Sequence, residues 1–186
     1  MSRDNALKGL IFVSMAVLML FGAFSLAGYL VAQLLGMPLS LGLPVSVRFL
    51  GLLLLASALS FMAWFFTFRK PADVFASTYL TFLKAFGRIP RTERSGRTEP
   101  LVVKGPYRYV RHPLYFGVVV MVFSWWLLLD YSFLPFTALF LFLWFDLVVI
   151  PFEEKELRAI FGREYEEYAR RTPRIFPFTN RDGELA

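Results

Sequence analysis

The sequence of 186 residues contains no cysteine and a single histidine, His112. Without cysteine there is no disulfide scaffold, no thiol nucleophile and no thiolate ligand for zinc or an iron–sulfur cluster. Because a zinc site needs three or four ligands, mostly imidazole or thiolate groups, one histidine also argues against zinc. We therefore expect no metal site, and any chemistry must come from carboxylates, tyrosines, arginines, one imidazole and a bound cofactor.

Two features of the composition point in opposite directions. Apolar residues make up 57% of the chain, whereas soluble domains average roughly 45–50%. The net charge is nevertheless +6, from 20 Lys and Arg against 14 Asp and Glu. The apolar excess requires an apolar solvent and the charges require water, so we expect an integral membrane protein whose polar residues are concentrated in a few segments.

Four stretches are apolar enough to cross a bilayer as helices, which takes about 20 residues for a hydrocarbon layer of about 30 Å. The predicted spans are residues 10–35, 48–68, 114–129 and 133–152. The fold class is therefore all-α, a single multi-pass membrane domain over residues 1–186.

Two polar segments carry apolar residues at helical spacing. Residues 71–86 predict an amphipathic helix lying in the membrane interface. Residues 153–171 predict a cytoplasmic helix packed back onto the protein and ended by Thr172 and Pro173.

The basic residues are distributed unevenly along the chain. Ten lie in the connection 69–111, seven follow Phe152 and two precede Gly9, whereas the other two connections carry none apart from Arg48 at a span end. Because Lys and Arg are retained in the cytoplasm, we expect both termini and the connection 69–111 on that side. The first span is too long for the apolar region of a signal peptide, which has about 7–15 residues.

The segment 87–100 carries four arginines among Pro, Ser, Gly and Thr. We interpret it as a solvated linker close to anionic lipid headgroups, in preference to a specific binding site. Nucleic acid is not expected as a partner, because the anionic lipid headgroups beside so small a basic segment would neutralise its charges first.

The segment 104–117 leads from a polar loop into the third span. Pro113 suits the first position of that helix, directly after His112. The free N–H groups of the helix start favour an anion, and Lys104 and Arg111 add positive charge. This segment predicts a site for a carboxylate or phosphate.

Glu153 and Glu154 follow the fourth span directly. Adjacent carboxylates repel each other unless a cation binds them, although a capping pair at a helix start is an equally good interpretation of these two alone. Asp146 lies two helical turns before Glu153 on the same face. It is either a functional carboxylate in the membrane or a structural partner of a Tyr or Trp side chain. Together with the anion site, these residues favour a small zwitterionic ligand.

The residues of 105–117, 153–157, 161–168 and 173–177 resemble the isoprenylcysteine carboxyl methyltransferase and phospholipid methyltransferase superfamily. The resemblance covers about residues 101–178 and implies S-adenosylmethionine as the cofactor, with residues 153–178 closing its site. The cofactor-site residues that it implies are Lys104, Gly105, Tyr107, Arg111, His112, Tyr115, Glu153 and Glu154.

Within that resemblance, the helix start at His112 is expected to take the methionine carboxylate, and Glu153 the ammonium group. Four aromatic residues are candidates for an adenine wall, although each is equally well explained as an ordinary interface aromatic. They are Tyr107, Tyr165, Phe176 and Phe178.

The implied reaction is in-line displacement at the sulfonium methyl, in which positioning and water exclusion supply most of the rate. The acceptor would be lipid-like, either an isoprenylcysteine carboxylate or a phospholipid amine. A carboxylate needs no base and would be bound by Arg111, whereas an amine would pass its proton to Glu154 or Asp146. Residues 147–150 are apolar, where eukaryotic isoprenylcysteine enzymes carry arginines, which weakens that assignment.

Two other functions are compatible with the C-terminal half. An NADPH-dependent reductase of the sterol-reductase type resembles the same segment, but such enzymes typically carry Asn before the motif tyrosine, where this chain has Leu114 before Tyr115. A membrane protein that keeps the fold without catalysis is the other alternative, and its intact charged motifs argue against it.

Overall fold

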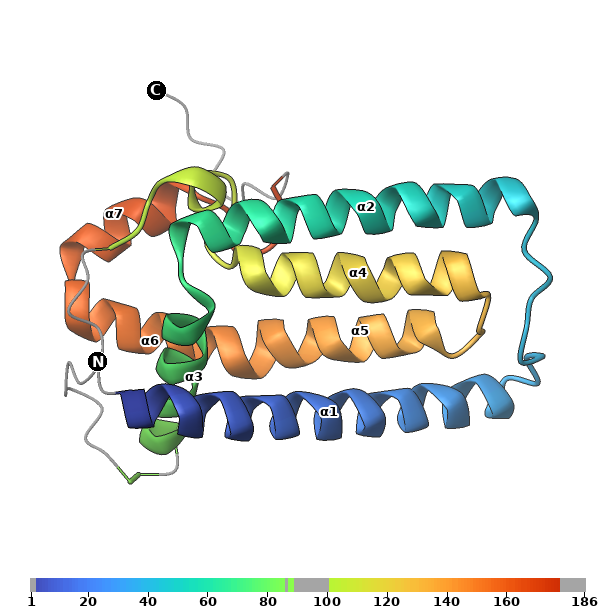
Figure 1. The fold of residues 1–186 in the computed structure, drawn as a ribbon, viewed down its shortest axis with the longest axis horizontal. Coiled ribbons are helices and arrows are strands. Elements are labelled where there is room, and N and C mark those ends of the chain that lie inside the picture. Colours follow the sequence, from blue (N-terminus) through green and yellow to red (C-terminus); the bar gives the residue numbers. More distant parts are fainter. Residues whose placement is uncertain (1–2, 86, 89–100, 178–186) are drawn as a thin grey trace.

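The computed structural model describes residues 3–85, 87–88 and 101–177, and within this part of the chain it contains helices and one isolated β-bridge but no strand. In this part of the chain, four helices lie alongside one another and the other helices gather at one end of them (Figure 1). The elements in chain order are α1 (Arg3–Leu34), α2 (Val45–Phe68), α3 (Pro71–Ala85), η1 (Gly105–Arg108), α4 (Pro113–Leu129), α5 (Leu134–Trp144), the π-helical turn η2 (Phe145–Val149), α6 (Ile150–Phe161) and α7 (Arg163–Arg171).

Three helices are long and apolar enough to cross a membrane: Leu7–Leu34, Val45–Phe68 and Leu134–Phe161. Large apolar side chains such as Leu18 and Val45 are exposed on the outer faces of α1 and α2, as lipid contact requires. The predicted all-helical fold is confirmed over the described residues, and these three helices support an integral membrane protein. The count of four spans stays a prediction, because the 17 residues of α4 measure only about 26 Å.

The helix that contains the fourth predicted span continues beyond Phe152. The expected separate helix beginning at Glu153 is wrong, because α5, η2 and α6 follow one another without a break as far as Phe161. The break lies at Gly162, whose φ of +53° favours glycine, and α7 then ends before Thr172 as predicted. The helix continues beyond the apolar region because the polar residues that follow Phe152 have good helix propensity. The change from apolar to polar residues therefore does not mark the end of the helix.

Asp130 joins two connections at the end of the bundle away from α3. Its carboxylate accepts hydrogen bonds from Ser40 Oγ at 2.6 Å, Gly42 N at 2.9 Å and Leu43 N at 3.1 Å, and pairs with Arg48 Nη2 at 3.2 Å. The bond from Ser40, with those from the backbone, lowers the pKa of Asp130 against the opposing effect of burial. In the sequence, Asp130 lies only between the predicted spans 114–129 and 133–152, whereas the structure makes it the link between the α1–α2 and α4–α5 connections.

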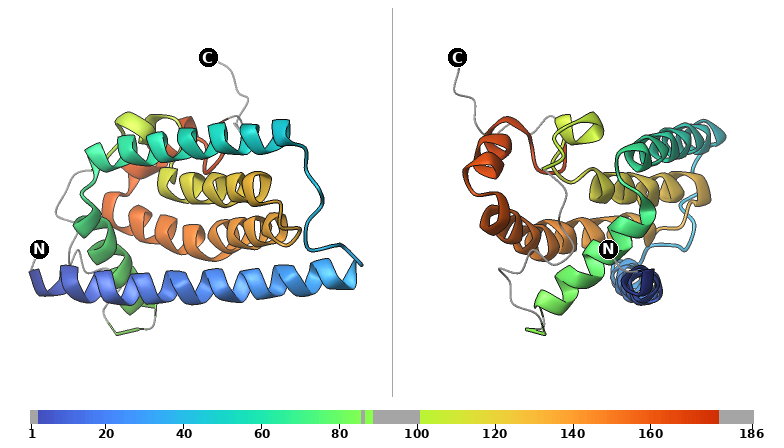
Figure 2. Two further views of the ribbon diagram at one scale, coloured as in Figure 1. Left: turned by 45° about the vertical axis from the view of Figure 1, so that its right-hand side comes forward. Right: turned by 60° about the vertical axis from the view of Figure 1, so that its left-hand side comes forward.

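Helix α3 crosses the other end of the bundle between α1 and α6 (Figures 1 and 2). Gly9 of α1 allows a close approach, since a Cβ there would lie 2.8 Å from Phe75 O. On its other side, Lys84 Nζ lies 2.6 Å from Glu156 Oε1, and Thr81 Oγ1 donates to Glu156 Oε2 at 3.1 Å. The predicted helix is therefore present over Pro71–Ala85 and fixed on both sides.

The start of α1, the end of α2 and the end of α6 lie at the same end as α3 and α7 (Figure 1). This arrangement is the one expected if both termini and the connection 69–111 share one side of the membrane. Which side is the cytoplasm stays a prediction. Most of the basic linker 87–100 lies outside the described residues.

Candidate functional site

The segment before α4 is fixed by the segment that follows α7. His112 is the N-cap of α4 and Pro113 its first residue, as predicted. Arg111 N donates to Pro173 O at 2.9 Å and His112 N to Arg174 O at 3.1 Å. Residues 173–174 thus hold both predicted site residues by backbone hydrogen bonds.

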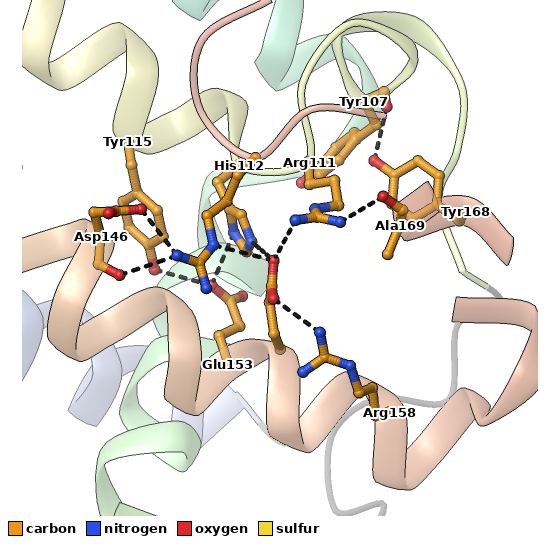
Figure 3. Close-up of polar contacts among 11 residues, drawn as sticks. Tyr107, Arg111, His112, Tyr115, Asp146, Glu153, Arg158, Tyr168 and Ala169 are labelled. Atoms are coloured by element: carbon orange, nitrogen blue, oxygen red, sulfur yellow. Dashed lines mark hydrogen bonds and ion pairs between the residues drawn. The ribbon is translucent and has the colours of Figure 1, made fainter. Parts of the chain in front are cut away.

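Glu154 is the centre of a cluster of charges in which three arginines contact one carboxylate (Figure 3). Its oxygens lie 3.1 Å from Arg111 Nη2, 3.1 Å from Arg158 Nη2 and 3.5 Å from Arg174 Nε, and its side chain is 3% exposed. A carboxylate this buried is costly without counter-charges. The three guanidinium groups supply them, so Glu154 is occupied by the protein's own cations.

His112 lies between the two adjacent glutamates. Its Nδ1 is 3.5 Å from Glu153 Oε2 and its Nε2 is 3.4 Å from Glu154 Oε1, while Tyr115 Oη donates to Glu153 Oε2 at 3.1 Å. Two carboxylate partners suit the imidazolium, which donates from both nitrogens. Burial alone would lower the pKa of His112, but hydrogen bonds to and charges of Glu153 and Glu154 outweigh it and raise the pKa above 6.5.

This raised pKa predicts a pH-dependent stability. The stabilisation from charged His112 is complete below the unfolded pKa of about 6.5 and is lost as the pH rises through the higher folded pKa. We expect the melting temperature of the detergent-solubilised protein to fall from about pH 6 to about pH 9, and less so in His112→Gln. An equal pH dependence in wild type and variant would contradict this role.

Asp146 is joined to the site through a π-helical turn. The Ile150 N–H bonds to Phe145 O, five residues back, and Pro151 has no N–H, so the carbonyl of Asp146 has no helical donor. Arg174 Nη1 donates to that carbonyl at 3.3 Å and to Asp146 Oδ1 at 3.0 Å. Asp146 thus anchors the arginine that also contacts Glu154.

A cavity lies between the end of α2, α3, η1, the start of α4, α6 and α7. It brings together five of the predicted cofactor residues, which are Tyr107, Arg111, His112, Tyr115 and Glu153. Two of the four aromatic candidates, Tyr107 and Tyr165, also line it.

The other predicted residues do not line this cavity. Lys104 is exposed, and Gly105 forms a turn at φ +61° against the ring of Phe68, leaving no space for a side chain. Phe176 packs against Phe116 and Phe142 instead. Phe178 lies outside the described residues.

Three buried polar atoms on residues lining the cavity have no hydrogen-bond partner within the described part of the chain: Arg69 Nε, Arg111 Nε and Tyr165 Oη. Burial raises the pKa of Tyr165, so its hydroxyl remains a donor. A buried donor without an acceptor costs about 1–3 kcal/mol. Donors of this kind suit a ligand that carries acceptor atoms.

The cavity measures about 80 Å³, whereas pockets that enclose drug-sized ligands measure roughly 300–1,000 Å³. The charged groups of the lining match a zwitterion. The cavity is too small for a nucleoside cofactor unless its walls move outward.

Three arginines of this region had no predicted role. Arg158 lies one turn after Glu154, a spacing that alone would have indicated the pair. Arg174 belongs to the closing segment 173–177, but no periodicity connects it with Asp146. Arg69 is, from the sequence, only the first of the ten basic residues in the connection 69–111.

Residues 47–164, more than half of the chain, match the model of the phospholipid methyltransferase family. The chain belongs to the phospholipid methyltransferase family. The resemblance found in the sequence is thereby confirmed, and the match extends it to α2, where no signature was recognised.

Curated relatives of this member of the phospholipid methyltransferase family are named either methanethiol or isoprenylcysteine methyltransferases. A methanethiol S-methyltransferase of Crocosphaera subtropica is 42% identical over 81 residues, 42% of this chain and 31% of the relative. Protein-S-isoprenylcysteine O-methyltransferase B of Arabidopsis thaliana is 37% identical over 115 residues, 60% of this chain and 53% of the relative. A probable protein-S-isoprenylcysteine O-methyltransferase of Oryza sativa subsp. indica is 42% identical over 79 residues, 42% of this chain and 41% of the relative. The chain thus spans between about a third and a half of these relatives. No solved structure shows significant similarity to it.

Proposed function

We propose that this protein transfers the methyl group of S-adenosylmethionine to a lipid-like acceptor at the membrane. The observation that carries the proposal is the cavity, which brings together Arg111, His112 and Glu153 in a member of a methyltransferase family. Three residues of its lining carry unpartnered donors. The relatives' names, which give sulfur and isoprenylcysteine acceptors, support methyl transfer in general. They leave the acceptor of this protein open.

The residues of the cavity match the two charges of the cofactor's amino-acid part. Arg111 Nε and the Tyr165 hydroxyl are donors for the carboxylate, beside the imidazolium of His112. Glu153 would take the ammonium group, since Glu154 is occupied by arginines. When bound, S-adenosylmethionine supplies an electrophilic methyl group on its sulfonium.

The geometry favours positioning roles for two of the three predicted catalytic residues. Asp146 is paired with Arg174, and Glu154 with three arginines, and neither lines the cavity. Arg111 lines the cavity, but its Nη1 donates to Ala169 O at 2.6 Å and its Nη2 pairs with Glu154. We propose that Arg111 binds a ligand through Nε, and that Asp146 and Glu154 hold the arginines in place.

Calorimetry of the detergent-solubilised protein tests the proposal. We expect S-adenosylhomocysteine to bind and NADPH not to bind. Loss of a hydrogen bond to a charged group costs about 1.5–3 kcal/mol, so Glu153→Gln should weaken S-adenosylhomocysteine binding about 10- to 100-fold. Glu164→Gln, at an exposed position of α7, is the matched control.

Wild-type protein that fails to bind S-adenosylhomocysteine at high micromolar concentration would refute methyl transfer from this cofactor. Binding of NADPH in its place would favour the reductase. Untargeted lipidomics of membranes incubated with methyl-labelled cofactor would then identify the acceptor.

A further inference from the structure

Arg69 is the C-cap of α2, where a cation is favourable beside the helix dipole. That effect needs only a charge near the helix end. Arg69 instead lines the cavity, next to Phe65 of the last turn of α2, and its Nε atom is buried with no hydrogen-bond partner in the described part of the chain. The Arg69 side chain therefore brings a positive charge and an unsatisfied donor to the wall of the cavity.

Two other unpartnered donors lie on the same cavity. Arg111 Nε comes from the segment before α4 and Tyr165 Oη from α7, so the three donors belong to three different parts of the chain. The Tyr165 side chain is 1% exposed, and water reaches it poorly. Tyr168, beside it, is already satisfied, since its hydroxyl donates to Tyr107 O at 2.7 Å.

The charges around the cavity are also unequal. Arg69, Arg111 and His112 face it as cations, and Glu153 is the acidic residue among the described lining residues. Glu153 already accepts a hydrogen bond from Tyr115 and contacts His112. The excess of donors and positive charge calls for an anionic ligand group with several lone pairs, which a carboxylate or a phosphate provides.

We propose that Arg69, with Arg111 and Tyr165, forms an anion subsite on the α2 side of the cavity that takes a carboxylate or phosphate group. The subsite deepens the proposed function by adding α2 to the ligand site. The anionic group belongs either to the amino-acid part of the cofactor or to an acidic acceptor. Both sources share the chemistry that the three donors require.

The test compares Arg69→Gln with Lys70→Gln, which removes a charge from the next residue, exposed and absent from the cavity lining. Three probes are titrated by calorimetry: S-adenosylhomocysteine, 5′-methylthioadenosine, which lacks the amino-acid part, and inorganic phosphate. Arg69→Lys keeps the charge and should keep part of the affinity that Arg69→Gln loses. Circular dichroism and the melting temperature show that each variant is folded.

If the subsite takes the cofactor's carboxylate, Arg69→Gln weakens S-adenosylhomocysteine about 10- to 100-fold and leaves 5′-methylthioadenosine unchanged. If it takes an acceptor's acidic group, both nucleosides bind as in wild type and only phosphate binding is lost. The proposal fails if all three probes bind Arg69→Gln as they bind wild type, if the two nucleosides weaken equally, or if Lys70→Gln has the same effect. The phosphate titration needs no cofactor. If phosphate binding depends on Arg69 but the protein does not bind S-adenosylhomocysteine, the proposed function is refuted and the anion subsite is retained.

Discussion

Lys84→Met is expected to destabilise the protein by about 3–5 kcal/mol, because it leaves the carboxylate of Glu156 buried without its counter-ion. The pair is short, at 2.6 Å between Lys84 Nζ and Glu156 Oε1, and its side chains are 2% and 5% exposed. The only other side-chain partner described for Glu156 is the hydroxyl of Thr81, which cannot neutralise a charge. The melting temperature in detergent measures the loss.

The double variant Lys84→Met/Glu156→Leu separates the pair from the packing around it. Replacing both partners by apolar groups of similar size is often neutral or stabilising, so the double variant should recover most of the lost stability. Arg163→Met is the matched control, because it breaks an exposed pair with Glu167 worth about 0.3–0.5 kcal/mol. A Lys84→Met protein no less stable than this control would show that the pair contributes little.

The same variant should also weaken the cavity. Val74, Ser77 and Thr78 of α3 form one of its walls, and Lys84 fixes α3 to α6. When the anchor is lost, that wall is less well positioned, and binding of S-adenosylhomocysteine should decrease along with stability. Recovery of both properties in the double variant would connect them to one contact.

The sequence predicted those parts of the molecule that depend on neighbouring residues. Charge-free stretches located the helices, because a bilayer imposes a minimum apolar length. His112 followed by Pro113 located the start of α4, because proline suits the first helical position. The glutamate pair and the Arg-His segment were expected at one site, and the structure joins them through His112.

The features that the sequence did not predict depend on contacts between distant residues. Arg174 meets Asp146 because Pro151 and the π-helical turn leave a carbonyl without a donor, and neither hydropathy nor periodicity encodes that geometry. Asp130 accepts hydrogen bonds from Ser40 and Gly42, which lie 90 and 88 positions away in the sequence. Arg69 carries no local pattern that distinguishes it from any other basic residue at the end of a span.

Glu154→Gln is the second change with a large expected effect. The substitution leaves Arg111 and Arg174 partly buried and without their shared anion, and a broken buried ion pair costs about 3–5 kcal/mol. The melting temperature should therefore fall further than in Glu153→Gln, whose side chain is 22% exposed against 3% for Glu154. The pH dependence from His112 should weaken too, because Glu154 is one of the two groups that raise its pKa.

Binding experiments distinguish this positioning role of Glu154 from direct contact with the cofactor. If Glu154 acts by holding Arg111 and His112, its loss disturbs the whole cavity, and S-adenosylhomocysteine and 5′-methylthioadenosine should weaken by similar factors. Glu153→Gln should weaken S-adenosylhomocysteine alone, because only that ligand has an ammonium group. Selective loss of S-adenosylhomocysteine in Glu154→Gln, with an unchanged melting temperature, would instead place Glu154 against the ligand and require Arg111 to have another partner when the cofactor is bound.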